Sequence, residues 1–210
     1  MGSMPSTTSN DHEVSTREKI MEAAYETLKK EGIKHTSARA IAREGDFNQA
    51  LIFYHFGGVN QLLVAAAEQS SKRQVEKYRE RIEGVTELGD LVRVAAELHA
   101  EDVADGSVTV VTQLMALAAY DEELGPRIME SFRPWIDLVA TAINRAFEGS
   151  PLKPFMPLQD MATGISALFL GLALMSRLDP DTFDEERVYS MMGMVSGMLA
   201  NVLAGKPAMG

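Results

Sequence analysis

The stretch that decides the fold is SARAIAREGDFNQALIFYHF, residues 37–56. Ser37 is a favoured helix N-cap, and the apolar residues within 38–44 follow it at helical spacing. A glycine–aspartate pair at 45–46 breaks that helix, and Asn48 caps a second short helix that fills the rest of the stretch. Two short helices joined by a tight turn predict a helix-turn-helix, whose second helix presents its N-terminal residues to the major groove of DNA.

Helical patterns continue on both sides of this stretch. Ser15-Thr-Arg-Glu18 fits a capping box, and the apolar stripe that follows it ends at Gly32. After a glycine pair, residues 59–82 form one long helical pattern with a charged second half. Further helices are predicted at 88–104, 108–119, 122–148, 158–178 and 184–204. The only β-branched run, residues 108–112, is five residues long and can be the first part of a helix. The sequence therefore predicts an all-α protein.

Three segments follow from these patterns. Residues 1–14 are expected to be a disordered tail, in which Met1-Gly-Ser before Met4 is typical of an expression-tag remnant. Residues 15–62 are predicted to be a three-helix domain that contains the helix-turn-helix, and residues 63–210 a helical C-terminal domain for ligand binding and dimerisation. With 46% hydrophobic residues, the chain of 210 residues has enough apolar side chains for a packed core.

The charge is distributed unevenly along the chain. The formal net charge is −10, but residues 15–62 carry +1, residues 63–210 carry −9 and residues 1–14 carry −2. Residues 15–62, here called the head, are nearly neutral and can approach DNA while residues 63–210, the acidic body, are held away from it. The electric field of the body is screened beyond ~8 Å at physiological salt. The overall acidity therefore does not exclude DNA binding.

The composition argues against a metal or cofactor site, a membrane span and export. The chain has no cysteine, and its four histidines lack metal-ligand spacing, so neither a metal nor a cofactor is expected. The longest apolar stretch, residues 165–176, is well below the ~20 residues that span a bilayer. No export signal is visible, and a cytoplasmic protein without a membrane partner is expected.

The head resembles the DNA-binding domain of tetracycline-repressor (TetR) family regulators. The resemblance covers residues 15–62 and rests on Thr16-Arg-Glu-Lys-Ile20, residues 37–44, Ile52-Phe-Tyr-His-Phe56 and Leu62-Leu63. It implies a homodimeric transcriptional regulator, a repressor by family analogy, that binds a palindromic double-stranded DNA operator and responds to an unidentified small molecule. Effector binding would change the separation of the two recognition helices.

Base and phosphate contacts are assigned to separate residues. Arg39 and Gln49 carry the forked groups that read guanine and adenine edges, and Ala50 and Leu51 suit thymine methyl groups; the alternative is that Arg39 and Gln49 are solvated surface residues. Phosphate contacts and the positioning of the recognition helix are assigned to Ser37, Asn48, Tyr54 and His55. Burial in the core of the head is the alternative for the last two, and that core is assigned to Phe47, Ile52, Phe53 and Phe56.

Two positions depart from the family pattern. Many members have tyrosine where this chain has Phe53 and lysine where it has Val59, and both groups commonly touch phosphate. A Gly57-Gly58 pair also replaces a proline-containing turn. Fewer neutralised phosphates predict a shallower salt dependence of DNA binding than a lysine-bearing relative shows.

The C-terminal body offers candidates for a ligand pocket. They are apolar side chains with a few polar tips: Gln113, Met115, Tyr120, Met129, Phe132 and Trp135. Ordinary core packing is the alternative reading for each, since methionine and aromatic residues at helical spacing commonly fill cores. His99 is expected to be a hydrogen-bonded or surface histidine.

The last two predicted helices are apolar around much of their circumference, which indicates a covering partner. Glycines spaced by four or seven let helix backbones approach closely, so these helices are predicted to form half of an intersubunit four-helix bundle. The interface is assigned to Gly164, Leu168, Gly171, Met175, Gly193, Met194, Gly197 and Met198. Packing within one chain is the alternative.

A helical enzyme or a protein-interaction module that does not bind DNA is the second hypothesis. No nucleophile–base pair, paired catalytic carboxylates or glycine-rich phosphate loop is visible in the sequence, so an enzyme is not expected.

Overall fold

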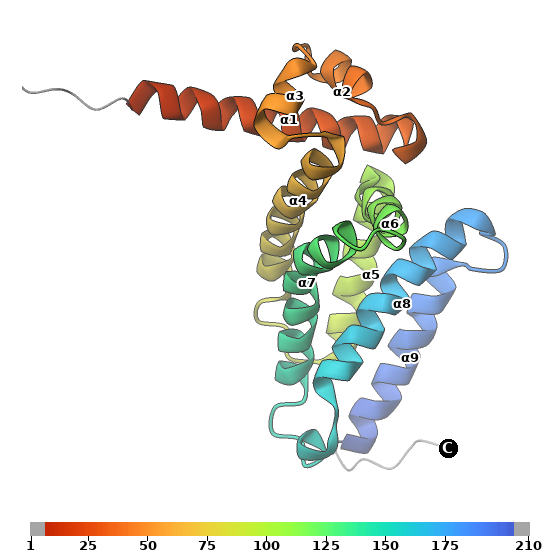
Figure 1. Cartoon of the computed structure of the whole chain (residues 1–210). Helices are drawn as coiled ribbons and strands as arrows, with labels where there is room; N and C mark the ends of the chain where they lie inside the picture. The colour runs from red at the N-terminus through yellow and green to blue at the C-terminus, as the bar shows by residue number, and fades with distance from the viewer. Residues whose placement is uncertain (1–6, 204–210) are drawn as a thin grey trace, which may run out of the picture. The chain divides into compact units, whose positions relative to one another are not determined.

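In the computed structural model, which describes residues 7–203 and the side chains of residues 15–198, the described chain is helical throughout (Figure 1). The α-helices are α1 (Thr7–Glu31), α2 (Ala38–Gly45), α3 (Ala50–Phe56), α4 (Val59–Ile82), α5 (Leu88–Asp105), α6 (Ser107–Ala118), α7 (Leu124–Ala146), α8 (Leu158–Leu178) and α9 (Glu185–Leu203). Two single 3-10 turns, η1 (Ile33–His35) and η2 (Lys153–Phe155), lie in the loops. The predicted all-α class is confirmed.

The helix boundaries follow the sequence closely, with one difference at the N-terminus. Helices α4 and α8 have the predicted bounds, and the β-branched run at 108–112 is part of α6. Helix α1 begins at Thr7, ahead of the predicted capping box at Ser15. Serine and glutamate three residues apart are also compatible with a continuing helix, so this local pattern did not mark the start. Of the expected disordered tail, residues 1–6 lie outside the described residues.

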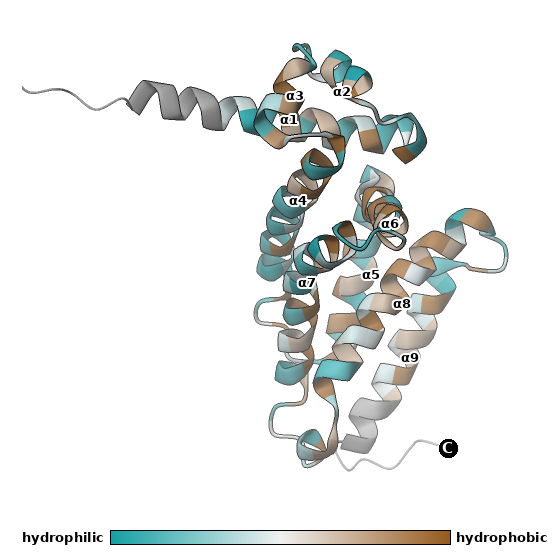
Figure 2. Ribbon diagram, in the orientation of Figure 1, coloured by the Kyte–Doolittle hydropathy of each residue, from teal (hydrophilic) through white to brown (hydrophobic). Residues whose placement is uncertain are grey.

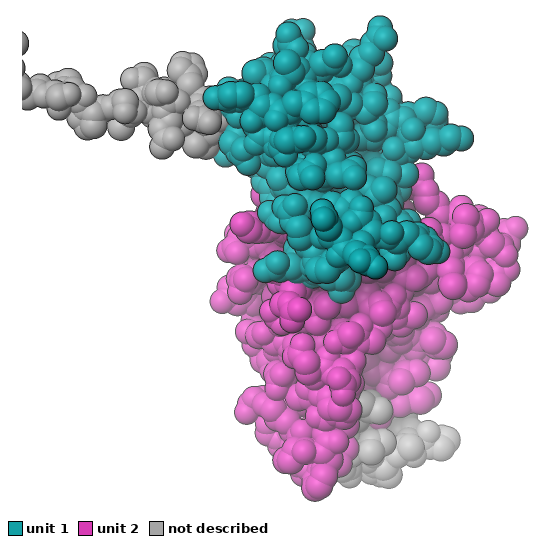
Figure 3. Space-filling view, in the orientation of Figure 1, with its two compact units in different colours: residues 1–70, 113–131 teal, residues 71–112, 132–210 magenta. Residues whose placement is uncertain are grey.

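The chain divides into two compact units (Figure 3). Unit 1 contains residues 1–70 together with residues 113–131, and unit 2 contains residues 71–112 and 132–210. Helix α4 contributes to both, since the division falls after Ser70. The predicted boundary at residue 62 therefore lies inside α4, near its first turns.

In unit 1, α1 packs against α2 and buries an apolar stripe from each helix. Its fully buried apolar side chains include Ile20, Ala24, Leu28, Ile41, Ile52 and Leu62. Gly45 ends α2 where the backbone comes close to α1, because a Cβ atom there would lie 2.3 Å from a ring carbon of Phe47 and 2.8 Å from the Cβ of Ala23. This close approach needs a glycine.

Unit 2 is built from two apolar clusters. The first joins α4, α5 and α7 through Val75, Tyr78, Ile82, Val94, Leu98, Leu138 and Ala142. The second joins α7 and α8 through Val139, Ala140, Ile143, Phe147, Leu158 and Ala162. Helix α9 packs along α5 and also contacts α8. Successive turns of α7 take part in both clusters, which makes it the central helix of the unit.

Candidate functional site

The turn between α2 and α3 has the geometry that the sequence predicts. Ser37 caps α2, with its hydroxyl oxygen accepting a hydrogen bond from the Ala40 N–H at 3.2 Å. Asp46 follows α2 in the left-handed region at φ 50°, which reverses the chain. The side-chain oxygen of Asn48 then accepts from the Ala50 N–H at 2.9 Å at the start of α3. A side-chain cap thus starts α2, whereas Asn48 bonds to the first residue of α3 from one position before Gln49, the N-cap residue, which makes no side-chain cap hydrogen bond.

Most residues assigned to DNA contact are accessible. Arg39, Gln49, Ala50 and Tyr54 are exposed, the tyrosine at 78%. Within the described part of the chain, Arg39 makes no hydrogen bond or ion pair. The remaining assigned residues are Ser37 and Asn48, which are exposed, and Leu51 and His55, which are half-buried.

Other basic groups of the head are already paired with acids of the same unit. Lys30 Nζ lies 2.6 Å from Glu44, and Arg43 lies 2.5 Å from Glu31. These exposed pairs fix the position of α2 on α1 only weakly, since exposed ion pairs contribute ~0–1 kcal/mol. Arg39 is therefore the arginine of α2 that is left free for a base.

Phe53 does not belong to the core of the head, contrary to the prediction. Its side chain is 54% exposed, whereas Ile52 is fully buried and Phe47 and Phe56 are half-buried. Residues 52 and 56 lie four apart and share a helix face, but residue 53 is rotated by ~100° from its neighbour. An exposed phenylalanine beside Tyr54 adds apolar surface to the face of α3 that remains open.

Arg17 is a site residue that the sequence pattern did not reveal. From α1 its guanidinium donates a hydrogen bond to the backbone carbonyl of His55 at 2.5 Å and lies 4.4 Å from the ring centroid of Phe56. It satisfies a carbonyl at the C-terminal end of α3 and stacks on an aromatic face there. Because the partners are far apart in sequence, no local pattern identified this contact.

The structure places the predicted ligand residues in different surroundings. Tyr120 is 97% exposed in the loop after α6, and Met129 is also exposed, so neither lines a buried pocket. The side-chain oxygen of Gln113 accepts a hydrogen bond from the Ile33 N–H within unit 1. Met115 and Phe132 are half-buried. Helical spacing indicates which residues share a face but not what that face contacts, so the assignment of these residues to a ligand stays a prediction.

Trp135 belongs to a group of buried and half-buried side chains in unit 2, here called the α5 cluster. Its contacting side chains are Tyr78, His99, Asp102, Trp135, Phe169, Glu185 and Tyr189, and the buried Ser166 precedes Phe169 by one turn of α8.

The aromatic rings of the α5 cluster form a continuous chain. The ring centroid of Trp135 lies 5.1 Å from that of Tyr78 and 5.5 Å from that of Phe169. Phe169 lies 4.5 Å from His99, and His99 lies 5.3 Å from Tyr189. The hydroxyl of Tyr78 donates a hydrogen bond to Asp102. Asp102 and His99 lie one turn apart on α5, so both ends of the chain of rings contact this helix.

Several polar atoms of the α5 cluster are buried without hydrogen bonds. Among the described residues, no partner satisfies either ring nitrogen of His99, Nε1 of Trp135 or Oγ of Ser166. His99 Nε2 lies 3.2 Å from Glu185 Oε2 but lacks hydrogen-bond geometry. The sequence predicted that His99 is either hydrogen-bonded or on the surface. With 1% exposure and no hydrogen bond, it is neither. Buried polar groups are normally paired, so this group is a candidate ligand site.

Asp102 is a buried carboxyl group without a basic ion-pair partner among the described residues. Only 4% of it is exposed, and Gln74 Nε2 lies 3.4 Å from its second oxygen. Burial and the charge of Asp105 raise the pKa of Asp102 to about 7. Lys77 opposes this rise slightly, but its ammonium group pairs with Glu101 at 2.8 Å.

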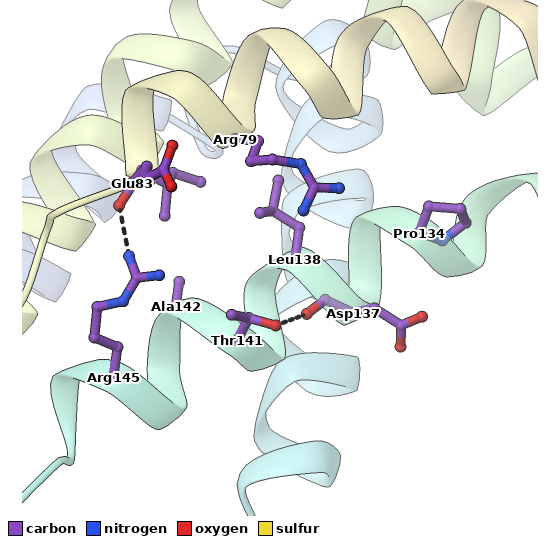
Figure 4. Close-up of a pocket in the computed structure, with 9 residues that line it drawn as sticks. Arg79, Glu83, Pro134, Asp137, Leu138, Thr141, Ala142 and Arg145 are labelled. Atoms are coloured by element: carbon purple, nitrogen blue, oxygen red, sulfur yellow. Dashed lines mark hydrogen bonds between the residues drawn. The ribbon is translucent and has the colours of Figure 1, made fainter.

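A surface groove of about 300 Å³ lies between α4 and α7 in unit 2 (Figure 4). It is lined by Arg79, Ile82, Glu83, Pro134, Asp137, Leu138, Thr141, Ala142 and Arg145. Arg145 donates to the Ile82 carbonyl at 3.3 Å, and the Thr141 hydroxyl donates to the Asp137 carbonyl at 2.8 Å. With charges of both signs and these polar groups paired, the groove favours no particular ligand class, and the α5 cluster is the better candidate.

Helices α8 and α9 carry many apolar residues (Figure 2), and several of their large apolar side chains are exposed. These exposed side chains, here called the uncovered face, are Leu168, Leu174, Met175, Leu178, Met191, Met194, Val195 and Met198. A Cβ atom added at Gly164, Gly171, Gly193 or Gly197 would meet nothing within 4 Å. All eight residues assigned to the dimer interface thus border open space in the single chain. By length and composition α8 would also suffice to cross a membrane.

Sequence comparisons identify related proteins. Residues 20–66 match the family described as "Bacterial regulatory proteins, tetR family", and residues 89–195 match "BetI-type transcriptional repressor, C-terminal". The HTH-type transcriptional regulator UidR of Escherichia coli (strain K12) is 24% identical over 189 residues, which cover 90% of this chain and 93% of UidR.

Solved structures share the fold. The fatty acid degradation regulator FadR from Bacillus halodurans superposes with a TM-score of 0.69 at 15% identity and covers 86% of this chain and 94% of its own. The multidrug binding protein EbrR complexed with proflavin has a TM-score of 0.58 at 25% identity, covering 84% and 96%. With a helix-turn-helix head, a helical body and matches to both domains, the chain belongs to the TetR family of bacterial DNA-binding transcriptional regulators.

Proposed function

We propose that this protein is a cytoplasmic repressor that binds a palindromic operator as a homodimer and releases it when a small-molecule effector occupies the body. The observation that carries the proposal is the exposed α2–α3 unit, in which Arg39, Gln49 and Tyr54 are accessible. Arginine and glutamine are suited to read base edges, and the tyrosine hydroxyl to contact phosphate. Proposals of specific base contacts rest on this accessibility.

Dimerisation is supported by the uncovered face of α8 and α9. Exposed leucine and methionine side chains on adjacent helices favour association, and glycines with open space above them allow close helix packing. We commit to a second copy of this chain as the occupant. A two-fold dimer of this kind places two recognition helices ~34–36 Å apart, in successive major grooves.

An effector is supported by the buried, unsatisfied polar atoms of the α5 cluster. The structural neighbour EbrR is described as a multidrug binding protein and was solved in complex with proflavin, so a protein of this fold takes up a small molecule. Helix α4 runs from the head unit into the body unit and is the proposed route of coupling.

The deciding experiment is selection of bound sequences from a random double-stranded DNA pool. Wild type is compared with Gln49→Ala and with Gln159→Ala, which removes an exposed glutamine on α8 and serves as the control. Wild type and the control should enrich the same palindrome, whereas Gln49→Ala should lose preference at defined positions, since a bidentate base contact contributes ~1–3 kcal/mol of discrimination. Failure of wild type to enrich any sequence over a range of salt would refute the operator-binding proposal.

The dimer is tested by Met194→Lys on the uncovered face, with Tyr120→Lys as a control at an exposed site outside α8 and α9. Burying a lysine in an apolar interface is costly, so sedimentation should show a monomer for Met194→Lys and a dimer for the control. Operator affinity should fall with the dimer. A wild-type protein that sediments as a monomer would refute the proposed interface, and one that partitions into lipid vesicles would identify a membrane as the occupant.

A further inference from the structure

We propose that Gln113 of α6 is a positioning residue for operator binding, because its side-chain oxygen holds the turn through which the chain enters α2. Gln113 lies outside residues 20–66, which match the DNA-binding family, but it belongs to the same compact unit as the helix-turn-helix. The inference rests on the proposed operator binding. It gives Gln113 a role in the head besides the ligand contact predicted for it.

The turn between α1 and α2 takes one of its hydrogen bonds from a distant part of the chain. Within the turn, the Gly32 carbonyl accepts from the His35 N–H at 3.2 Å and from the Thr36 hydroxyl at 2.8 Å. No side-chain cap starts η1 from within the turn. Instead, the Ile33 N–H donates to Gln113 Oε1 at 2.5 Å, across 80 positions of sequence. A half-buried N–H is costly to leave without an acceptor, so this contact stabilises the turn.

The backbone at Gly32 is adapted to the Gln113 side chain. Its φ of +75° lies in the left-handed region that favours glycine, as expected for the residue that follows α1. A Cβ atom at this position would also lie 3.2 Å from Gln113 Oε1. The glycine therefore serves two purposes: it ends α1, and it leaves room for the glutamine to reach the next N–H.

The contact lies at the entry to the helix-turn-helix, and a second long-range hydrogen bond lies at its exit. Ile33 is four residues before Ser37, the N-cap of α2. At the other end, Arg17 donates to the His55 carbonyl in the last turn of α3. Apolar packing of α2 on α1 is not directional, whereas hydrogen bonds have a preferred geometry. The two bonds therefore fix both ends of the helix pair.

Loss of the Gln113 oxygen should loosen the start of α2 without removing a group that is assigned to DNA. Ser37 and Arg39 lie within the first turn of α2 and would be held less precisely. Gln113→Leu is close to glutamine in size but lacks the acceptor. It should lower operator affinity about tenfold with the same base preference, since each of two protomers loses one hydrogen bond to a half-buried N–H.

The test compares wild type with three variants of the full-length protein, by fluorescence anisotropy on the palindrome obtained from the DNA pool. Gln113→Glu keeps an acceptor oxygen at the same reach and should recover most of the affinity that Gln113→Leu loses. Gln159→Leu makes the same exchange at an exposed glutamine on α8 and should bind as wild type does. The salt dependence of wild type and Gln113→Leu should be equal, because no cation that neutralises phosphate is removed.

Hydrogen exchange of the Ile33 amide, followed by NMR, reports the contact directly and without DNA. The amide should exchange at least tenfold more slowly in wild type than in Gln113→Leu, and Gln113→Glu should restore the protection. Exchange of the wild-type Ile33 amide at the rate of an unstructured peptide would overturn the proposal, even if Gln113→Leu folded poorly. Equal loss of operator affinity in Gln113→Leu and Gln113→Glu would overturn it as well.

The two proposals fail in distinguishable ways. If the DNA pool yields a palindrome and Gln113→Leu binds it as tightly as wild type, the positioning role is wrong and the regulator remains. A changed consensus for Gln113→Leu would also refute the positioning role. If the Ile33 amide is protected as expected but wild type enriches no DNA, the contact exists, and the operator proposal fails together with the role assigned to Gln113.

Discussion

Asp102→Asn should make the protein more stable at neutral and alkaline pH. The wild-type carboxyl is buried, and its hydrogen bonds come from Tyr78 and Gln74 without a basic ion-pair partner among the described residues. Asparagine has nearly the same shape: its carbonyl oxygen can accept from Gln74, and its amide can donate to the hydroxyl oxygen of Tyr78. Replacing the acid therefore removes a charge that the folded state accommodates poorly.

The sign and size follow from the pKa of Asp102. Its folded value of about 7 is above its ordinary value of 3.8, so the folded state binds more protons than the unfolded state between these values. Wild-type stability then falls as the pH rises from about 4 to about 7 and levels off above that. At ~1.4 kcal/mol per pH unit, the part of this loss between pH 5 and 8 is about 2–3 kcal/mol.

The assay is urea unfolding of wild type and Asp102→Asn at several pH values, at one protein concentration because a dimer unfolds in a concentration-dependent way. The free energy of unfolding of Asp102→Asn minus that of wild type should increase by about 2–3 kcal/mol between pH 5 and pH 8. Glu101→Gln is the control: Lys77 and Arg81 lower the pKa of Glu101 to about 2, so its contribution is lost only in acid and should be flat from pH 5 to 8. A pH-independent difference for Asp102→Asn would refute the assignment of a buried carboxyl with a raised pKa.

Three further predictions concern the head. Val59→Lys should add one phosphate contact per protomer and steepen the dependence of log K on log salt by ~1.8 for a dimer; an unchanged slope in operator binding would contradict it. Gly45→Ala places a Cβ against Phe47 and Ala23 and should lower the free energy of unfolding by ~1–3 kcal/mol, measured with urea, and wild-type stability would disprove the close approach. Arg17→Ala removes the donor to the His55 carbonyl and should weaken operator binding about tenfold without altering base preference; a changed consensus would assign Arg17 to base contact instead.

Much of the fold follows from local pattern. The helix-turn-helix was predicted from Ser37, the 45–46 break and Asn48, because these side chains cap or reverse the backbone within a few residues and need no distant partner. The bounds of α4 and α8 were predicted for the same reason, since apolar periodicity and glycine or proline breaks act locally. The family resemblance also rested on contiguous segments of the head.

The candidate sites depended on contacts that no local pattern encodes. The prediction for Trp135 placed it among ligand residues but paired it with Tyr120 and Met129, which are exposed, and not with Tyr78, Phe169 or the histidine on α5. Phe53 was also assigned to the core of the head, but it is exposed and the preceding residue, Ile52, is the one that is buried.

The sequence by itself thus determined where helices begin and end, which residues share a helix face, and that the head is a DNA-binding unit. Only the tertiary structure decided which faces meet: that Arg17 reaches the end of α3, and that carboxyl groups from α5 and α9 lie among rings from four helices. The physical reason is the range of the forces involved. Capping and helical periodicity act within one or two turns, whereas burial, unpaired polar atoms and the raised pKa of Asp102 arise only when segments distant in sequence exclude water together.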